Sequence, residues 1–300
     1  MLLVAGASGF LGRTLALEAL ASGRPVTGLV NRHAAADQPG LGVVTADLTE
    51  PSTAKNLLRR LEPKWVVNCA AVANVDECER DPERARALNV ELPRALAAAC
   101  AEAGVGLVHM STDSVFDGER GNYYEDDEPV PVNVYGRSKL EGERAVHEVL
   151  PAALVLRTNF IGVSPSRSVG LADWIASKLE SGERIRGFAD VMFAPLLVNE
   201  LARLVLAAID SELQGLYHVA ARDACSKYDF GCRLARALGF DSTLIDRATL
   251  ADAKLTARRP LNTSLSSSRL ERALGRPMPS IESAIAGYVA LHGAGYASRL

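Results

Sequence analysis

Short apolar runs alternate with helical patterns over the first half of the chain, which is typical of a parallel sheet covered by helices. The runs expected as strands are Leu2 to Ala5, Pro25 to Val30, Val43 to Val44, Trp65 to Cys69, Gly106 to Met110 and Leu154 to Arg157. The helical patterns are Leu11 to Ser22, Thr53 to Leu61 and Ala85 to Ala103, and Pro93 should bend or restart the last of them. This order predicts an α/β fold with a doubly wound parallel sheet, the Rossmann fold, whose ligand crevice lies beyond the carboxyl ends of the strands.

The pattern changes at about residue 160. Strand-like runs become shorter, and the helical patterns are more widely separated: Gly170 to Ser181, Val198 to Asp210, Tyr228 to Leu238 and Ile281 to His292. We therefore expect an NAD(P)-binding domain over 1–159 and a smaller C-terminal, mainly substrate-binding domain over 160–300. Some segments within 160–300 are allowed, in this prediction, to belong to the first domain.

A glycine-rich turn, Gly6-Ala7-Ser8-Gly9-Phe10-Leu11-Gly12, follows the first strand and precedes a helix. Glycines at this spacing let the backbone approach a pyrophosphate, whose charge meets the free N–H groups at the helix N-terminus. The alternative is a plain tight turn, but its place between strand and helix favours dinucleotide binding. The cofactor-binding residues expected here are Gly6, Ser8, Gly9, Phe10, Leu11 and Gly12.

The ends of the next strands bear on the choice of cofactor. After the second strand comes Asn31-Arg32, with no acid to accept from the ribose hydroxyls and a guanidinium suited to a 2′-phosphate. NADPH is therefore preferred and NADH remains open, as does a purely solvent-facing Arg32. Asp47 and Leu48 should lie near the adenine, and the small residues Cys69, Ala70 and Ala71 should let the cofactor lie close.

A candidate catalytic group opens a further helical stretch. Tyr135 and Lys139 stand four residues apart, on one helix face, and a cation beside a phenol is expected to lower the phenol's pKa and ease proton exchange. Alone, such a pair is common on exposed helix surfaces. Thr112 and Asp113 follow the fifth strand and should reach the same crevice, where a hydroxyl can orient a carbonyl. Tyr135, Lys139 and Thr112 are thus the predicted catalytic residues, the first two also touching the cofactor.

The sequence resembles the extended short-chain dehydrogenase/reductases and, more narrowly, the dTDP-4-dehydrorhamnose reductase family. The blocks that carry the resemblance are the glycine loop, 68–71, 111–118, 133–143, 156–158 and 258–265. One block departs from the family: where an Asp-Gln-x-Gly-x-Pro-Thr motif is usual, this chain has Asp190-Val191-Met192-Phe193-Ala194-Pro195-Leu196. The departure bears on the identity of the sugar more than on the type of reaction.

The resemblance implies NAD(P)H-dependent reduction of a keto group on a nucleotide-activated deoxysugar. Tyr135 would then protonate the developing alkoxide, Lys139 would hold the nicotinamide ribose, and Thr112 would orient the carbonyl. Substrate contacts are expected from Asp113, Val115, Phe116, Asn159, Arg259 and Asn262. Two alternatives stay open, a non-catalytic NADP-binding regulatory subunit and a nucleotide-sugar epimerase.

Composition excludes several other classes of partner. The net charge of −3 gives no positive field to gather nucleic acid, and no apolar run is long enough to cross a bilayer, so neither nucleic acid nor membrane is expected and the predicted location is cytoplasmic. The five cysteines should be buried free thiols, and no metal site is expected. The acidic run 125–128 is interpreted as a solvated loop rather than a metal-linked dimer contact, although a homodimer remains possible.

Overall fold

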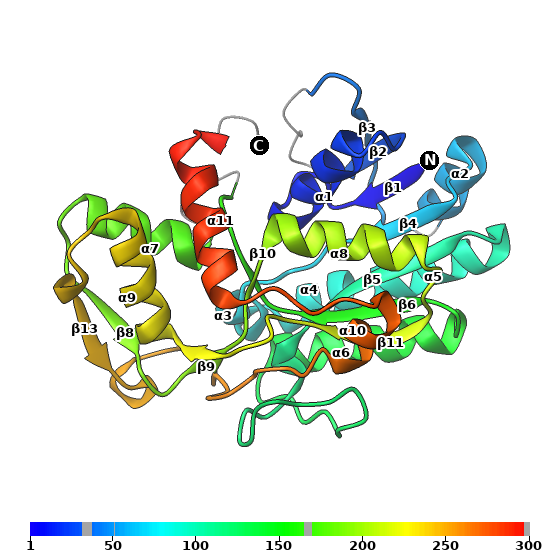
Figure 1. The fold of residues 1–300 in the computed structure, drawn as a ribbon. Helices are drawn as coiled ribbons and strands as arrows, with labels where there is room; N and C mark the ends of the chain where they lie inside the picture. Colours follow the sequence, from blue (N-terminus) through cyan, green and yellow to red (C-terminus); the bar gives the residue numbers. More distant parts are fainter. Residues whose placement is uncertain (32–37, 51, 165–169, 297–300) are drawn as a thin grey trace.

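The computed structural model describes residues 1–31, 38–50, 52–164 and 170–296. At its centre is a seven-stranded sheet in the order β11-β6-β5-β4-β1-β2-β3, with every neighbouring pair parallel (Figure 1). The strands are β1 (Leu2–Ala5), β2 (Val26–Val30), β3 (Gly42–Thr45), β4 (Trp65–Asn68), β5 (Gly106–Thr112), β6 (Leu154–Thr158) and β11 (Gly215–Val219). The strand order reverses between β1 and β4, which confirms the predicted doubly wound sheet and places its ligand crevice there.

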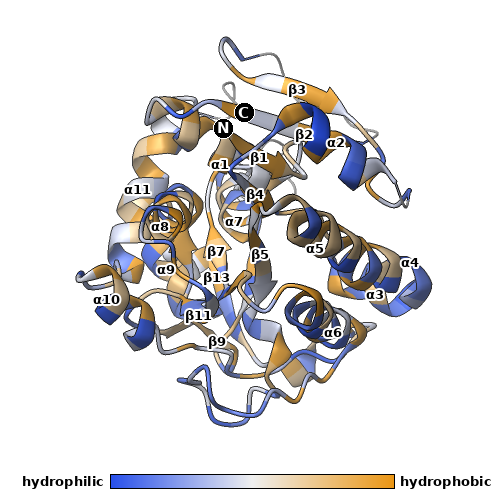
Figure 2. Cartoon of the chain, turned by 90° about the vertical axis from the view of Figure 1, so that its right-hand side faces the viewer, coloured by the Kyte–Doolittle hydropathy of each residue, from blue (hydrophilic) through white to orange (hydrophobic). Residues whose placement is uncertain are grey.

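Helices cover both faces of this sheet (Figure 2). Along one face lie α2 (Thr53–Leu61), α5 (Leu92–Ala103) and α6 (Val134–Val149), and along the other lie α1 (Phe10–Ala21) and α8 (Val198–Asp210). Leu3 of β1 packs into the hydrophobic core between the sheet and α2, α5 and α6. Val4 packs into the core on the other face, between the sheet and α1 and α8. Burial on both sides explains why the strands are continuous apolar runs instead of alternating ones.

The stretch predicted as one helix over Ala85 to Ala103 is divided. It consists of α4 (Pro82–Arg86), a π-helical turn η1 (Ala87–Glu91) and α5, preceded by α3 (Val75–Arg80). Pro93 lies in the first turn of α5, directly after the π turn in which the Leu92 N–H donates to the Ala87 carbonyl, and the backbone stays helical from η1 into α5, so the helix changes register there and does not restart. The Asn89 side chain in the π turn accepts a hydrogen bond from the Val72 N–H and donates one to the Val72 carbonyl. It also donates to the Ser138 hydroxyl at 3.0 Å. The turn therefore ties the loop after β4 to helix α6.

The second half of the chain builds a smaller group of elements and also returns to the sheet. The group holds α7 (Leu171–Glu180), α9 (Lys227–Leu238), α11 (Ile281–Gly293) and three short strand pairs: β8 (Ile185–Phe188) with β13 (Ile245–Ala248), β9 (Met192–Phe193) with β12 (Cys225–Ser226), and β7 (Phe160–Ile161) with β10 (Leu196–Leu197). Between them the chain forms α8, which packs on α1, and β11, which extends the sheet beside β6. After short turns η3 (Ser242–Leu244) and η4 (Leu250–Asp252), helix α10 (Ser268–Leu274) contacts β11.

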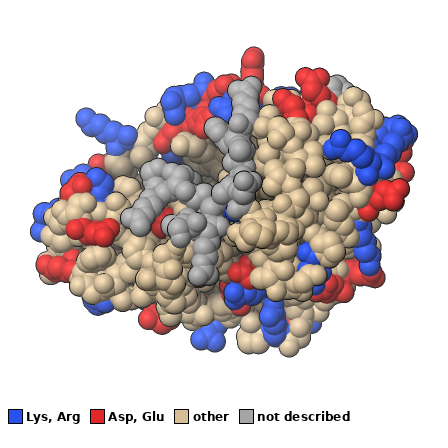
Figure 3. Space-filling model, turned by 90° about the horizontal axis from the view of Figure 1, so that it is seen from above, with Lys and Arg blue, Asp and Glu red and all other residues tan. Residues whose placement is uncertain are grey.

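The surface agrees with the modest net charge. Acidic and basic side chains are interspersed around the edge of the face shown in Figure 3. In the part of the chain that the structure describes, no helix is long and apolar enough to cross a membrane.

Candidate active site

The glycine loop is shaped by close backbone approaches that exclude a side chain. Gly6 has φ of +78°, and a Cβ placed there would lie 2.9 Å from the backbone nitrogen of Ala70. A Cβ on Gly12 would lie 2.2 Å from the carbonyl oxygen of Gly6. The loop thus folds tightly onto the end of β4, and α1 begins at Phe10 with its first N–H groups free for an anion.

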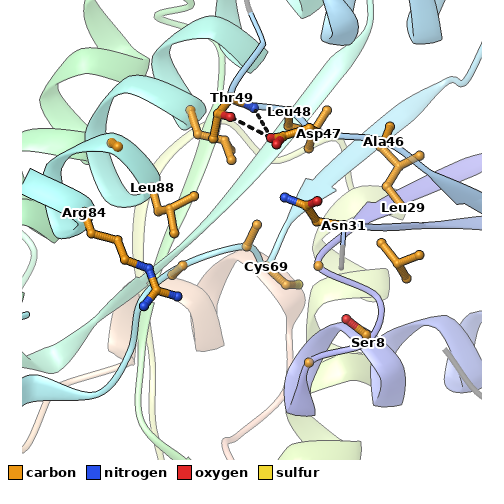
Figure 4. A pocket seen from close by; sticks show the side chains of 17 residues that line it. Ser8, Leu29, Asn31, Ala46, Asp47, Leu48, Thr49, Cys69, Arg84 and Leu88 are labelled. Carbon is orange, nitrogen blue, oxygen red and sulfur yellow. Dashed lines mark hydrogen bonds between the residues drawn. The ribbon is translucent and has the colours of Figure 1, made fainter. Parts of the chain in front are cut away.

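A cavity of about 660 Å³ opens beside this loop, at the carboxyl ends of β1, β2 and β4 (Figure 4). Predicted cofactor residues on its wall are Gly6, Ser8, Gly9, Asn31, Asp47, Leu48, Cys69, Ala70 and Ala71. Its size and its glycine cradle fit a dinucleotide, and it stands at the strand-order reversal where such ligands bind. Arg32 lies outside the described residues.

Some predicted cofactor residues do not line this cavity, and some lining residues were missed. Phe10 packs edge-on against Phe160, with ring centroids 5.5 Å apart, and Leu11 is buried in the core. The lining residues that sequence reasoning did not select are Leu29, Val30, Ala46, Thr49, Arg84, Ala87, Leu88 and Leu92. Most of these are apolar side chains whose contribution depends on tertiary packing, which a local pattern does not contain.

Helix α6 is fixed against the end of β5 by its first turn. The Asn133 side chain caps it by accepting from the Gly136 N–H at 2.8 Å. A Cβ on Gly136 would lie 2.2 Å from the Ser114 carbonyl oxygen, so only glycine allows the helix to approach the turn η2 (Asp113–Val115) this closely. The approach brings Tyr135 next to Thr112.

The Tyr135 phenol lies within interaction range of the Thr112 hydroxyl. Burial raises the pKa of Tyr135 to about 12; the Thr112 hydroxyl opposes this rise and the nearby Asp113 carboxylate adds to it. Lys139 is not among the groups that shift the Tyr135 pKa, so the lowering expected from the sequence is not found. Near neutral pH the phenol is therefore fully protonated, as a proton donor must be.

Lys139 is buried, and its ammonium is directed toward β5. Its Nζ donates to the Met110 carbonyl at 2.7 Å and lies 3.5 Å from Nε2 of His109. Burial lowers the pKa of Lys139 to about 8, although the Glu143 carboxylate opposes the shift. His109 belongs to the core: it is buried, its Nδ1 lies 3.2 Å from the Asn68 amide nitrogen, and burial holds its pKa well below the usual value.

A buried lysine whose pKa is lowered costs folding free energy while it is charged. We expect Lys139→Met to raise the free energy of unfolding at pH 7 by about 1–3 kcal/mol, because a drop from 10.5 to about 8 is worth somewhat more than this and the Met110 carbonyl loses a donor. As pH rises from 8 toward 10.5, the wild-type lysine becomes neutral first in the folded state and then in the unfolded state. The wild-type protein therefore gains stability, and the difference in unfolding free energy between Lys139→Met and wild type must shrink. Urea unfolding of both proteins at pH 7 and pH 9 measures it, and a difference that grows with pH would contradict the assignment.

The predicted substrate residues Asp113 and Asn159 meet in a buried network. Asp113 accepts from the side chains of Asn159 and Thr263, both at 2.7 Å, and from Thr112 at 3.1 Å. Burial raises its pKa in spite of these donors. The carboxylate thus joins the ends of β5 and β6 to the C-terminal segment and fixes the position of Thr112.

Other predicted substrate residues have their side chains engaged within the protein. Val115 and Phe116 are completely buried, and the Phe116 ring stacks on Tyr123 at 4.2 Å, so their side chains belong to the core and only their backbone is left for a ligand. Asn262 accepts from the Ser264 hydroxyl at 2.8 Å and packs on Gly121. Arg259 pairs with Asp76 at 3.0 Å, which joins the C-terminal segment to α3.

Lys227, at the start of α9, was not selected from the sequence. It is partly buried, and burial lowers its pKa while the Asp113 carboxylate raises it and Arg259 lowers it. Its side chain therefore lies within electrostatic range of the end of β5. No ion pair or side-chain hydrogen bond holds its ammonium within the described ranges, which leaves it available to an anionic ligand.

The acidic run differs from the solvated loop that was expected. Glu125 is buried and accepts from the His218 backbone N–H at 2.9 Å, and Asp126 pairs with Arg269 at 2.7 Å. These acids attach the loop to β11 and α10. Among the described residues no group of three or more His, Cys, Asp or Glu side chains could hold a metal, and all five cysteines are free, Cys69 being the only one that is not fully buried.

Comparisons with known proteins agree with this geometry. Residues 1–292 match the profile of the RmlD substrate binding domain family. The chain is 37% identical to a probable low-salt glycan biosynthesis reductase of Haloferax volcanii, over 94% of this chain and 95% of that protein. It is 32% identical to a methionine adenosyltransferase 2 subunit beta of Danio rerio, over 90% and 83%. A solved dTDP-4-dehydrorhamnose reductase from Clostridium acetobutylicum superimposes with a TM-score of 0.85 at 27% identity, covering 97% of this chain and 99% of that one.

The family match spans nearly the whole chain and includes both the glycine loop and the tyrosine and lysine of α6. The resemblance inferred from the sequence blocks is therefore confirmed. The protein belongs to the RmlD substrate binding domain family, and so to the extended short-chain, NAD(P)-dependent reductases of the dTDP-4-dehydrorhamnose reductase type.

Proposed function

We propose that this protein uses NADPH to reduce a keto group on a nucleotide-activated deoxysugar, as its reductase relatives are named for doing. The observation that carries the proposal is the close approach of α6 to the end of β5, which brings Tyr135 next to Thr112 on the same sheet edge as the dinucleotide-sized cavity. A protonated phenol beside a second hydroxyl is the arrangement that a carbonyl reduction requires on the oxygen side.

The residues divide the work between binding and proton transfer. The bound nicotinamide would supply the hydride. Thr112 orients the substrate carbonyl, and Tyr135 gives its proton to the oxygen as negative charge develops there. Lys139 holds the nicotinamide ribose, and Asp113 accepts from the Thr112 hydroxyl at 3.1 Å until the substrate carbonyl takes over that proton.

The preference for NADPH rests on the end of β2. Asn31 is on the cavity wall there, so the position that would carry a ribose-binding acid carries an amide instead. The Asp47 carboxylate, further along the wall, already accepts from the Thr49 hydroxyl at 2.6 Å and from its backbone N–H at 3.0 Å. At the end of β2 itself a 2′-phosphate would therefore meet the Asn31 amide and not a carboxylate, and Arg32 follows Asn31 directly in the chain.

The substrate class is supported by positive charge near the end of β5. Lys227 lies within electrostatic range of Asp113 and of Arg259, which also pairs with Asp76 at 3.0 Å. Two cations suit the diphosphate of a sugar nucleotide, whose two negative charges remain at neutral pH. The domain division at residue 159, the cytoplasmic location and the homodimer suggested by the sequence stay predictions.

A regulatory subunit without catalysis is the second candidate, favoured by the similarity to the Danio rerio subunit. Such a protein needs no proton donor in its crevice, whereas Tyr135 stands here within interaction range of Thr112. An epimerase would keep its cofactor through each turnover and show no net consumption.

The deciding experiment supplies purified protein with NADPH and a 4-keto-6-deoxy nucleotide-sugar and follows absorbance at about 340 nm. We expect stoichiometric oxidation of NADPH, and slower oxidation of NADH at equal concentration. Tight NADP binding without turnover of any keto-sugar would support the regulatory candidate and refute the proposal.

A further inference from the structure

Arg84 is a positively charged residue on the cavity wall that no motif identifies. It extends from α4 into the cavity, on the wall facing Ser8 and Asn31 (Figure 4). Its Nη1 donates to Glu77, the two being an ion pair with partly exposed side chains. Within the described ranges its other guanidinium nitrogens have no partner, so most of its donors are free to meet a ligand.

The direction of Arg84 follows from how its helix is anchored. Asp81 caps α4 by accepting from the Arg84 backbone N–H at 3.0 Å, and the next residue, Ala85, is completely buried and fixes the rotation of the helix. Arg84, Leu88 and Leu92 recur every four residues through α4, η1 and α5, and all three line the cavity. They form one continuous wall, with the cation at its beginning and the two leucines after it.

The wall that faces Arg84 determines which part of a dinucleotide lies near it. Gly6 packs on Ala70, so the glycine loop and the segment Cys69 to Ala71 are adjacent, and Arg84 lines the same cavity across from Ser8 of this loop (Figure 4). The free N–H groups at the start of α1 set the place of the diphosphate there. The apolar Leu48, Leu88 and Leu92 instead suit the adenine ring.

We propose that Arg84 is a cofactor-binding residue that contacts the dinucleotide diphosphate from the side opposite the glycine loop. The inference rests on the proposed function, because it requires a bound dinucleotide. A guanidinium presents parallel N–H donors that match two phosphate oxygens, and the diphosphate would then have donors on both sides. Glu77 orients the guanidinium through Nη1 and leaves the remaining nitrogens toward the cavity.

Arg86 provides a matched control on the same helix. It pairs with Glu91 at 2.6 Å and lies 3.7 Å from Glu141, and it does not line the cavity. Arg84→Gln and Arg86→Gln therefore remove the same charge from one helix, but only the first removes it from the cavity. Thermal melting of both variants without ligand checks that each remains folded.

The test measures cofactor binding directly, without substrate, by calorimetric titration of each protein with NADP⁺ and with NAD⁺. Arg84→Gln should raise Kd by about tenfold for both cofactors, as expected for the loss of a charge-assisted hydrogen bond, and Arg86→Gln should leave both unchanged. Equal Kd values for the two variants would overturn the inference, and so would a loss confined to NADP⁺, which would assign Arg84 to the 2′-phosphate. If the wild-type protein binds neither cofactor, the proposed function itself is refuted, and this outcome is distinct from the equal Kd values that would refute only the role of Arg84.

Discussion

Tyr135→Phe should lower kcat for keto-sugar reduction by about 10²–10⁴-fold and leave the Kd of the cofactor unchanged, because only the proton donor is removed. The ring would remain packed against the small cluster around Val72 and Cys78, so the fold should not respond. Steady-state kinetics with NADPH, combined with a binding titration, separates the two effects.

Tyr124→Phe is the control for this variant. Tyr124 is 48% exposed on the loop after Tyr123 and has no contact with the catalytic pair, so its variant should keep wild-type kcat. Since the Tyr135 pKa is raised to about 12, wild-type activity should show no loss of the phenolic proton between pH 7 and 10. Full activity of Tyr135→Phe would remove this residue from the mechanism.

Sequence reasoning succeeded where the relevant physics is local or periodic. The buried strands are continuous apolar runs because helices cover both faces of the sheet, and this pattern is visible without coordinates. Gly6 and Gly12 are required by backbone contacts within the loop itself and with the adjoining strand end. Thr112 could be assigned to the crevice because the carboxyl ends of parallel strands meet at one edge of the sheet, and the four-residue spacing put Tyr135 and Lys139 on one helix face.

It failed where a side chain's partner comes from a distant segment. The motif places Lys139 on the same helix face as Tyr135, but the Met110 carbonyl determines where its ammonium points. Phe116 stands in a family block, yet Tyr123 and Arg157 enclose its ring. Arg84 and Lys227 have no sequence signal of their own, since only the packing of η1 and β12 brings them to the crevice.

Beneath the catalytic residues lies a buried ion pair that no sequence pattern indicated. Arg157 on β6 donates to Glu143 on α6 at 2.7 Å and 3.0 Å, and the side chains are only 4% and 5% exposed. Ser111 on β5 also donates to this carboxylate, and the guanidinium lies 5.2 Å from the Phe116 ring centroid. The pair thus joins the helix that carries Tyr135 to the strand beside Thr112.

Arg157→Met should lower the free energy of unfolding by about 3–5 kcal/mol, because it leaves the Glu143 carboxylate buried without its counter-ion. Urea unfolding at pH 7 measures the change. Adding Glu143→Leu should recover part of the loss, since the double variant buries no charge at this position. Arg94→Met, which removes an exposed partner of Glu148 at 3.1 Å, should cost less than about 1 kcal/mol. If Arg157→Met costs no more than Arg94→Met, the pair does not hold α6 against the sheet, and the position of Tyr135 must depend on Asn133 and Gly136 alone.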